Sequence, residues 1–210
     1  MENTVTYKIL ESITTTEGRT VSLCGFSASI GKKLVIGVVH GDEPQGEAII
    51  NRYMEEVQNP NLLFIPCLNP DGLSKSTRVN ANGVDINRNF PTNNWEWTEH
   101  GNYYGGAEPS SEIETRFLTD IIEKYKPSAI ITLHTPYKIV NYDGPAQNLA
   151  NMISEIIGYP VEPSIGYPTP GSFGTYAGVE RAIPTITLEL DEYASIEKLY
   201  KPMKQIFDNL

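Results

Sequence analysis

Cysteine, positive charge and long apolar runs are all scarce in this sequence. With two cysteines among 210 residues, the dense disulfide framework of small secreted domains is excluded. Cys24 and Cys67 each lie in a strand-like run, where a small buried thiol is the expected role, with a disulfide between them as the alternative that nothing in the sequence indicates. No window approaches the ~18 apolar residues of a membrane span, and MENTVTYKILESITTTEGRT has no basic segment followed by an apolar core. We therefore expect a cytoplasmic protein with no membrane association.

Acidic residues outnumber basic ones. The chain has 16 lysines and arginines against 26 aspartates and glutamates, which gives a formal net charge of -10. The basic residues are scattered along the chain, so nothing indicates electrostatic capture of nucleic acid or of an anionic membrane. We expect no nucleic-acid partner.

Short apolar runs alternate with helical patterns along the chain. Runs rich in Ile, Val and Leu predict buried strands over Lys33–His40, Leu62–Asn69, Ser128–His134 and Ile183–Leu190. Helical spacing predicts a helix after Pro44 with an apolar face of Ile49, Ile50, Tyr53, Met54 and Val57, and helices from Ser111, over Gln147–Ile157 and over Ile196–Leu210. This alternation predicts an α/β fold: one domain over residues 1–210, with a mostly parallel or mixed central sheet and helices on both faces.

Two histidines and a glutamate lie at the ends of three predicted strands. In open α/β sheets, ligands bind beyond the carboxyl ends of the strands, where His40, His134 and Glu189 would meet. Glu43 adds a second carboxylate near His40, and Pro44 disfavours helical geometry at Glu43. Imidazole and carboxylate are the ligands of a catalytic zinc, which keeps three protein ligands. The residues therefore favour a metal site in this crevice.

Structural roles are the alternative for each of these side chains. A lone histidine at a strand end is more often a structural or surface residue, and His100, in the loop WTEHGNYYGG, is assigned to that class. Glu189 would be an isolated carboxylate in an apolar strand, ITLEL. Because an unpaired buried carboxylate is costly and rare, a functional role is favoured there.

A second group of polar residues lies in STRVNANGVDINRNFP, residues 76–91. Asn82-Gly83 is the preferred pair for a two-residue type I′ hairpin turn. That hairpin would place Ala81 opposite Val84, Asn80 opposite Asp85 and Arg78 opposite Asn87. With Arg88 next in the chain, two guanidiniums and an amide would form a receptor for a carboxylate or an oxyanion. Surface arginines paired with acidic neighbours remain the alternative.

The order of these residues resembles the carboxypeptidase A-like zinc peptidases. That family has His-x-x-Glu, then an Arg, then Asn-Arg, a distant His and a Glu on a late strand. This sequence has these residue types in the same order: His40, Glu43, Arg78, Asn87, Arg88, His134 and Glu189. NPDG (69–72), GVDINRNFP (83–91) and SEIE (111–114) are also similar to family signatures, and the likeness runs from about Lys33 to Tyr193.

The resemblance implies a role for each matching residue. His40, Glu43 and His134 would hold one zinc ion, and Asp85 would orient a ligand histidine. Glu189 would be the general base, and Arg78 would stabilise the oxyanion of the tetrahedral intermediate. Asn87 and Arg88 would bind the free terminal carboxylate of a small peptide substrate, which implies an exopeptidase.

Two further segments each have a functional and a structural interpretation. Tyr167, in GYPTPGSFG, loosely matches a tyrosine on the family's mobile loop and would bind substrate, although a rigid Pro-Gly turn is equally consistent. Ser111 and Glu114 match a family motif, but Ser-x-x-Glu before an apolar helix is also a capping box. We expect the capping box.

Within the family, the sequence is most similar to the bacterial murein tripeptide amidases. The stretches NANGVDINRNFPTNNW and GYPTPGSFG carry that likeness, which implies cytoplasmic cleavage of the γ-D-glutamyl–diaminopimelate bond of recycled wall peptides. LHTPYKIVNYDGP (133–145) and LELDEY (188–193) depart from the amidase pattern, and both are expected to border the substrate pocket. The competing hypotheses are a zinc deacylase of N-acyl amino acids and a binding module that holds wall peptides without cutting them.

Overall fold

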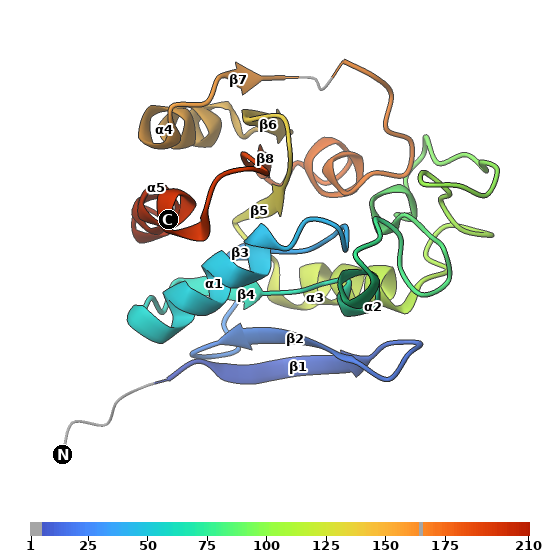
Figure 1. The fold of residues 1–210 in the computed structure, drawn as a ribbon, viewed down its shortest axis with the longest axis horizontal. Helices are drawn as coiled ribbons and strands as arrows, with labels where there is room; N and C mark the ends of the chain where they lie inside the picture. The colour runs from blue at the N-terminus through green and yellow to red at the C-terminus, as the bar shows by residue number, and fades with distance from the viewer. Residues whose placement is uncertain (1–5, 164–165) are drawn as a thin grey trace.

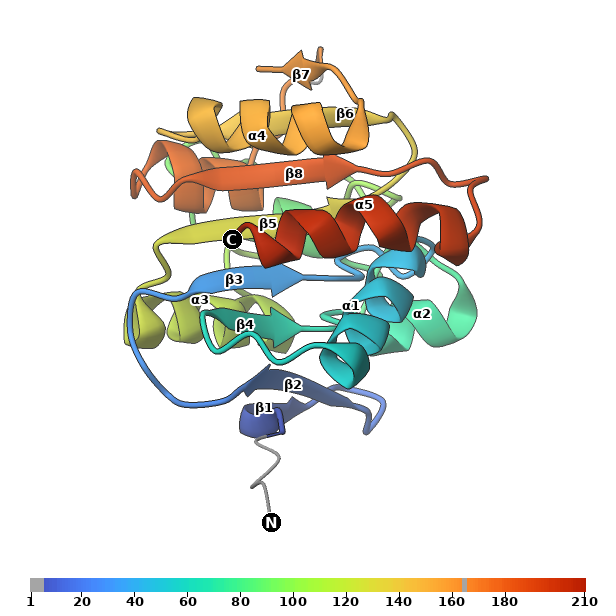
Figure 2. The ribbon, with the colours of Figure 1, turned by 90° about the vertical axis from the view of Figure 1, so that its left-hand side faces the viewer.

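A single mixed sheet forms the centre of the computed structural model, which describes residues 6–163 and 166–210 (Figures 1 and 2). Eight strands pair in the order β1-β2-β4-β3-β5-β8-β6-β7. Their bounds are β1 Lys8–Thr14, β2 Thr20–Gly25, β3 Lys33–Ile36, β4 Leu62–Ile65, β5 Ala129–His134, β6 Ile139–Asp143, β7 Val161–Glu162 and β8 Thr185–Glu189. The four central strands β4, β3, β5 and β8 are parallel, so their carboxyl ends lie at one edge.

Helices cover both faces of the sheet, as the alternating pattern predicts. Figure 1 shows α1 (Gln45–Glu56), α4 (Gln147–Ile157) and α5 (Ile196–Asp208) on one face, and α2 (Pro70–Lys75) and α3 (Ile113–Tyr125) on the other. A six-residue π-helix, η2 (Gly174–Val179), joins the α3 side, and a short 3-10 helix, η1 (Ile86–Arg88), lies in the connection before α3. The predicted fold class is confirmed.

Alternation along each strand divides the core into two layers. In β3, Val35 packs in the layer beneath α1, α4 and α5, whereas its neighbours Leu34 and Ile36 pack in the layer beneath α3. All three side chains are fully buried. A strand buried on both faces needs an unbroken apolar run, which is why the runs in the sequence identified the central strands.

The predicted helices begin and end close to where the sequence places them. Pro44 is the N-cap of α1, so Glu43 lies outside the helix as expected. α4 has the predicted bounds, and α5 begins at Ile196 as predicted. α3 begins at Ile113 rather than at Ser111.

The first two predicted strands are too long at their carboxyl ends. β3 ends at Ile36, so His40 lies in the following loop and not on the strand. Val38 has φ 50, which takes the backbone out of the extended conformation. Gly37 also approaches Pro66 so closely that a Cβ would lie 2.4 Å from the Pro66 carbonyl oxygen. The loop thus bends over the sheet edge before it reaches His40.

The predicted type I′ hairpin is absent. Gly83 N–H donates to the Asn80 carbonyl and Asn80 N–H donates to the Val84 carbonyl, so Asn80 is opposite Val84 and not Asp85. Of the two turn residues only Gly83 has a positive φ, 73°, whereas type I′ geometry requires it at both central positions. The Asn80 side chain accepts from Asn82 and Val84 N–H groups and so supports a different turn.

The predicted capping box at Ser111 and Glu114 is also wrong. The N-cap of α3 is Glu112, and no side chain caps the helix. The Ser111 hydroxyl donates to the Glu112 carboxylate instead. Glu114 is fully buried and accepts a hydrogen bond from Asn80, so tertiary contacts have replaced the local cap.

Cys67 is buried and Cys24 is half-buried, and both are free thiols, in agreement with the sequence. Among residues 6–163 and 166–210, no helix combines the length and the apolar character needed to cross a membrane.

Candidate metal centre and active site

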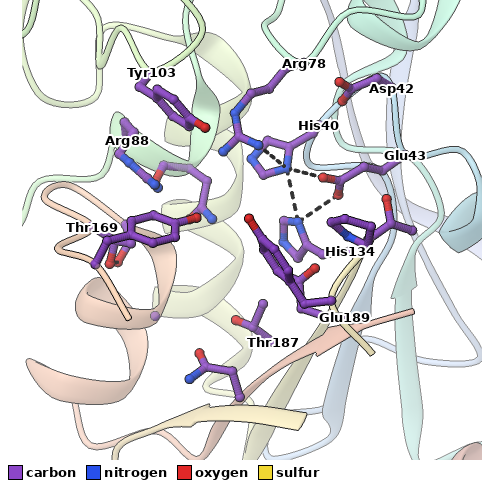
Figure 3. A pocket seen from close by; sticks show the side chains of 18 of the residues that line it. His40, Asp42, Glu43, Arg78, Arg88, Tyr103, His134, Thr169, Thr187 and Glu189 are labelled. Carbon is purple, nitrogen blue, oxygen red and sulfur yellow. Dashed lines mark hydrogen bonds and ion pairs between the residues drawn. The ribbon is translucent and has the colours of Figure 1, made fainter. Parts of the chain in front are cut away.

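His40, Glu43 and His134 lie together at the carboxyl edge of the sheet (Figure 3). Glu43 Oε1 is 2.9 Å from His40 Nδ1, and Glu43 Oε2 is 2.9 Å from His134 Nδ1. The two Nδ1 atoms are 3.2 Å apart. All three side chains are buried. The structure therefore brings the three predicted ligands to one point.

The arrangement of these nitrogens suits a shared metal ion. Two nitrogens that each bond to one tetrahedral zinc at ~2.05 Å are separated by about 3.3 Å. The observed 3.2 Å agrees with that separation. Two imidazoles and one carboxylate also form the donor set of a catalytic zinc, with one position left for water or substrate. The residues present thus fit zinc.

Neighbouring charges shift the pKa values of the three side chains. Burial opposes protonation of His40, but Glu43 and Asp85 outweigh it and raise the pKa of His40 to about 9. Burial would raise the pKa of Glu43, yet the two histidines lower it, so Glu43 is ionised. For His134, burial dominates and lowers the pKa. The carboxylates of Glu43 and Asp85 thus favour positive charge at this buried cluster, a suitable environment for a cation.

Strand pairing places Glu189 beside the three residues. β5 and β8 run parallel, and His134 is the register partner of Glu189. Glu189 Oε2 has no hydrogen-bond partner within the described part of the chain. Burial, followed by the charge of Glu43, raises the pKa of Glu189 to about 8. A carboxyl group with a pKa near neutrality is suited to proton transfer.

Arg78 and the fully buried Asp85 form an ion pair next to His40. Arg78 Nη2 lies 2.9 Å from Asp85 Oδ2, and Asp85 Oδ1 lies 3.3 Å from His40 Nε2. Arg78 Nη1 points the other way, to within 3.3 Å of His40 Nδ1. Asp85 therefore anchors Arg78 through Nε and Nη2 and leaves Nη1 directed toward the metal centre. It also touches the far side of the His40 ring.

Asn87 and Arg88 line the same cavity, of about 340 Å³. Asn87 Oδ1 accepts a hydrogen bond from Phe173 N–H, so its amide NH2 is the group left to donate. Arg88 is 6% exposed and forms no ion pair with any carboxylate among residues 6–163 and 166–210. Burial lowers the pKa of Arg88, with a further contribution from the like charge of Arg78. A buried, unpaired guanidinium is a receptor for an anion.

Aromatic rings surround the mouth of the cavity. The Tyr103 ring lies beside both guanidiniums (Figure 3). Its centroid is 5.0 Å from Arg78 Cζ and 5.8 Å from Arg88 Cζ. Tyr167 lines the cavity and is 43% exposed. His100 stacks on Tyr104 away from the cavity, in agreement with its expected structural role.

Comparison with known proteins assigns this site to a family. The sequence pattern described as zinc carboxypeptidase matches residues 7–156. The chain belongs to the zinc carboxypeptidase family. It is 35% identical over 179 residues to murein peptide amidase A of Vibrio campbellii. That alignment covers 77% of this chain and 70% of the Vibrio protein. It is 31% identical over 186 residues to murein peptide amidase A of Escherichia coli K12. That alignment covers 81% of this chain and 76% of the Escherichia coli protein.

Solved structures agree with this membership. Murein-tripeptide amidase from Escherichia coli O157 superposes with a TM-score of 0.83 at 25% identity, over 97% of this chain and 90% of that one. Carboxypeptidase A from Helicoverpa armigera superposes with a TM-score of 0.77 at 16% identity. The superposition covers 97% of this chain and 66% of the carboxypeptidase, which shows that the two share a fold. The resemblance seen in the sequence is confirmed, and this zinc carboxypeptidase family member is a hydrolase.

Several cavity residues were not predicted individually from the sequence. The two segments expected to border the pocket do so, through Thr135, Pro136, Tyr137, Asn141, Asp143, Glu189 and Glu192. The alternation of IVNYD would have predicted that Asn141 and Asp143 share a face. Tyr103 had no such signal, because only the folding of its loop brings it over Arg78.

Proposed function

We propose that this protein is a zinc-dependent amidase and exopeptidase that removes the C-terminal residue of a small murein peptide at the γ-D-glutamyl–diaminopimelate bond. Arg88 is the observation that carries the proposal. A buried guanidinium that pairs with no carboxylate of the described residues, next to the free amide NH2 of Asn87, suits the terminal carboxylate of a residue about to be released. The named relatives, two murein peptide amidases, support murein as the source of the peptide.

Each polar group of the cavity has a role in the proposed reaction. His40, Glu43 and His134, whose ligand atoms lie together, would hold one zinc ion. Zinc, when bound, supplies a Lewis acid and lowers the pKa of a water molecule. Glu189 would accept a proton from a water molecule that attacks the carbonyl carbon, and would return it to the amine nitrogen as the C–N bond breaks.

The two arginines contact different groups of the substrate: Arg78 the carbonyl oxygen and Arg88 the terminal carboxylate. Arg78 Nη1, held by the contact of its guanidinium with Asp85, donates to the carbonyl oxygen as negative charge develops there. Asn87 and Arg88 bind the carboxylate of the leaving residue, and Tyr167 covers it from the mouth of the cavity. We place all of these groups in one catalytic domain, residues 1–210.

We also propose that the enzyme works in the cytoplasm. Two free thiols, one of them buried, are consistent with a reducing compartment. In that compartment the enzyme would encounter cell-wall peptides after their import.

One assay tests the proposed function. Zinc-loaded protein is incubated with L-Ala-γ-D-Glu-meso-diaminopimelate and with the same peptide carrying a C-terminal carboxamide. We expect release of free diaminopimelate from the first and a rate at least ~10-fold lower for the second, since charge-assisted hydrogen bonds contribute about 1.5–3 kcal/mol. Cleavage of N-acyl amino acids in preference to the peptide would favour a deacylase. Binding of the peptide without cleavage would favour a binding module.

A further inference from the structure

The segment from Arg78 to Asn89 carries the polar side chains of one wall of the cavity. Arg78, Asn87 and Arg88 line the cavity, and Asp85 anchors Arg78 beside the metal centre. Within these twelve residues, 78–89, the only helix or strand is η1, which is three residues long. The directions of the two guanidiniums therefore depend on the side-chain contacts that fix this segment.

Glu112 binds the first half of the segment. Its Oε2 accepts hydrogen bonds from Asn80 Nδ2 at 2.8 Å and from Asn82 Nδ2 at 2.7 Å. Its Oε1 accepts from the Ser111 hydroxyl at 2.6 Å, and the whole residue is 4% exposed. Hydrogen bonds to an ionised carboxylate are roughly twice as strong as those between neutral groups. Glu112 is therefore the main anchor of the turn at residues 80–84.

Glu112 also binds the second half of the segment. Its N–H donates to Asn89 Oδ1 at 3.1 Å, and Asn89 Nδ2 donates to Ser111 Oγ at 2.9 Å. Asn89 is fully buried and directly follows Arg88. Gly106 leaves room for these contacts, since a Cβ there would lie 2.4 Å from Ser111 Oγ and 2.5 Å from Asn89 Nδ2. Glu112 thus connects both ends of the segment.

The cavity is lined by neither Glu112 nor the two asparagines that donate to its carboxylate. Their effect on a substrate must therefore pass through the segment. The connection is short, because Asn80 Oδ1 accepts from Val84 N–H at 3.1 Å and Val84 directly precedes Asp85. A misplacement of ~1 Å in a group that positions substrate can lower the rate about 100-fold.

We infer that Glu112 is a positioning residue for the two cavity arginines. Its carboxylate and its N–H fix the two ends of the segment, so that Arg78 and Arg88 keep their separate directions. The inference rests on the proposed function, in which Arg78 contacts the carbonyl oxygen and Arg88 the terminal carboxylate of the substrate.

The test places a like charge against Glu112. Asn82 is exposed, and Asn82→Asp replaces its amide donor with a carboxylate that should repel Glu112 Oε2 and displace the turn. We expect kcat/KM for the free-carboxylate peptide to fall about 10- to 100-fold, and its preference over the carboxamide peptide to fall at least ~3-fold. Adding Glu112→Gln removes the repulsion and supplies an amide donor, so the double variant should regain most of the preference. Asn61→Asp adds the same charge to an exposed residue just before β4 and should match wild type.

Other results would contradict the inference. A role in stability alone would lower both rates in proportion, and the preference for the free carboxylate would stay unchanged in Asn82→Asp. If the wild type cleaves neither peptide, or does not distinguish them, the proposed function fails separately. Hydrogen exchange followed by mass spectrometry then decides. The backbone amides of residues 83–89 should exchange at least ~10-fold faster in Asn82→Asp than in Asn61→Asp, and equal exchange would show that Glu112 does not position the segment.

Discussion

At the scale of single residues, burial determines the chemistry of this cavity. Glu189 has a pKa of about 8 because it is buried and lies near Glu43, whereas Glu43 is ionised because two imidazoles flank it. Two glutamates of one site therefore differ in protonation for reasons of environment alone. Within the described part of the chain, Arg88 pairs with no carboxylate, whereas Arg78 pairs with Asp85. These contrasts assign a separate task to each side chain.

The first prediction concerns Glu189. Glu189→Gln should lower kcat/KM by about 10²- to 10⁴-fold, because the amide cannot accept the proton from water. Zinc content, measured by atomic absorption, should stay at the wild-type level because the three ligands remain. Wild-type kcat/KM should also fall as the pH is lowered, since Glu189 then takes up a proton and cannot act as a base. Activity close to wild type in the variant would exclude Glu189 as the base.

The second prediction concerns Arg88. Arg88→Ala should raise KM about 10-fold or more for a peptide with a free terminal carboxylate, because a charge-assisted contact is lost. Its kcat/KM for the carboxamide peptide should change much less. If the variant still distinguished the free from the amidated peptide as well as wild type, Arg88 would not bind the carboxylate.

At the scale of elements, the loop from β3 to α1 depends on close backbone packing. The loop carries His40 and Glu43, and Gly41 between them lies against the backbone of α2, where a Cβ would be 2.0 Å from the Gly72 carbonyl carbon. The start of the loop and the start of α1 also approach closely at Gly37 and Gly46, where a Gly46 Cβ would lie 2.9 Å from Gly37 Cα. Neither contact is with a flexible side chain. The position of two proposed zinc ligands is therefore set by glycines.

The third prediction tests this packing. Gly41→Ala should destabilise the protein by about 1–3 kcal/mol, the usual cost of overpacking, and should weaken zinc binding because the loop must move. Urea unfolding and zinc titration would measure the two effects. Gly101→Ala is the matched control, because nothing lies within 4 Å of its Cβ position. A Gly41→Ala variant as stable as Gly101→Ala, with normal zinc affinity, would show that the contact does not constrain the loop.

At the scale of the whole molecule, one sheet edge collects residues that are far apart in the chain. Glu43, His134 and Glu189 come from the loop after β3 and from the neighbouring strands β5 and β8. A ligand that joins such segments stabilises the folded state, because the unfolded chain does not hold the site together.

The fourth prediction follows from this linkage. Zinc at ~100 times its dissociation constant should stabilise the wild type by about 2.7 kcal/mol, which a rise in Tm by calorimetry would reveal. A chelator should abolish both the rise and the activity. His134→Ala should show little or no rise in Tm, while His100→Ala should behave as wild type because His100 lies outside the cavity. A full response in His134→Ala would contradict the proposed ligand set.

How well the sequence predicted the molecule depended on the kind of interaction. Apolar runs and helical spacing predicted the four central strands and the principal helices, because burial imposes those periodicities directly. The turn at Asn82-Gly83 and the cap at Ser111 were predicted wrongly, because Asn80, Asn89 and Glu112 offer tertiary hydrogen bonds that local propensity does not contain. The edge strand β7, two residues long, has no periodicity to detect.

The sequence by itself determined the α/β class, the family resemblance and the residues proposed to hold zinc, because residue type and order carry that information. Only the tertiary structure decided which of these groups meet. The register of β5 with β8 places Glu189 beside His134, and the register of β6 with β8 places Asn141 opposite Thr187 in the same cavity. The physical reason is that register and close backbone approach depend on contacts between distant segments, which no local pattern specifies.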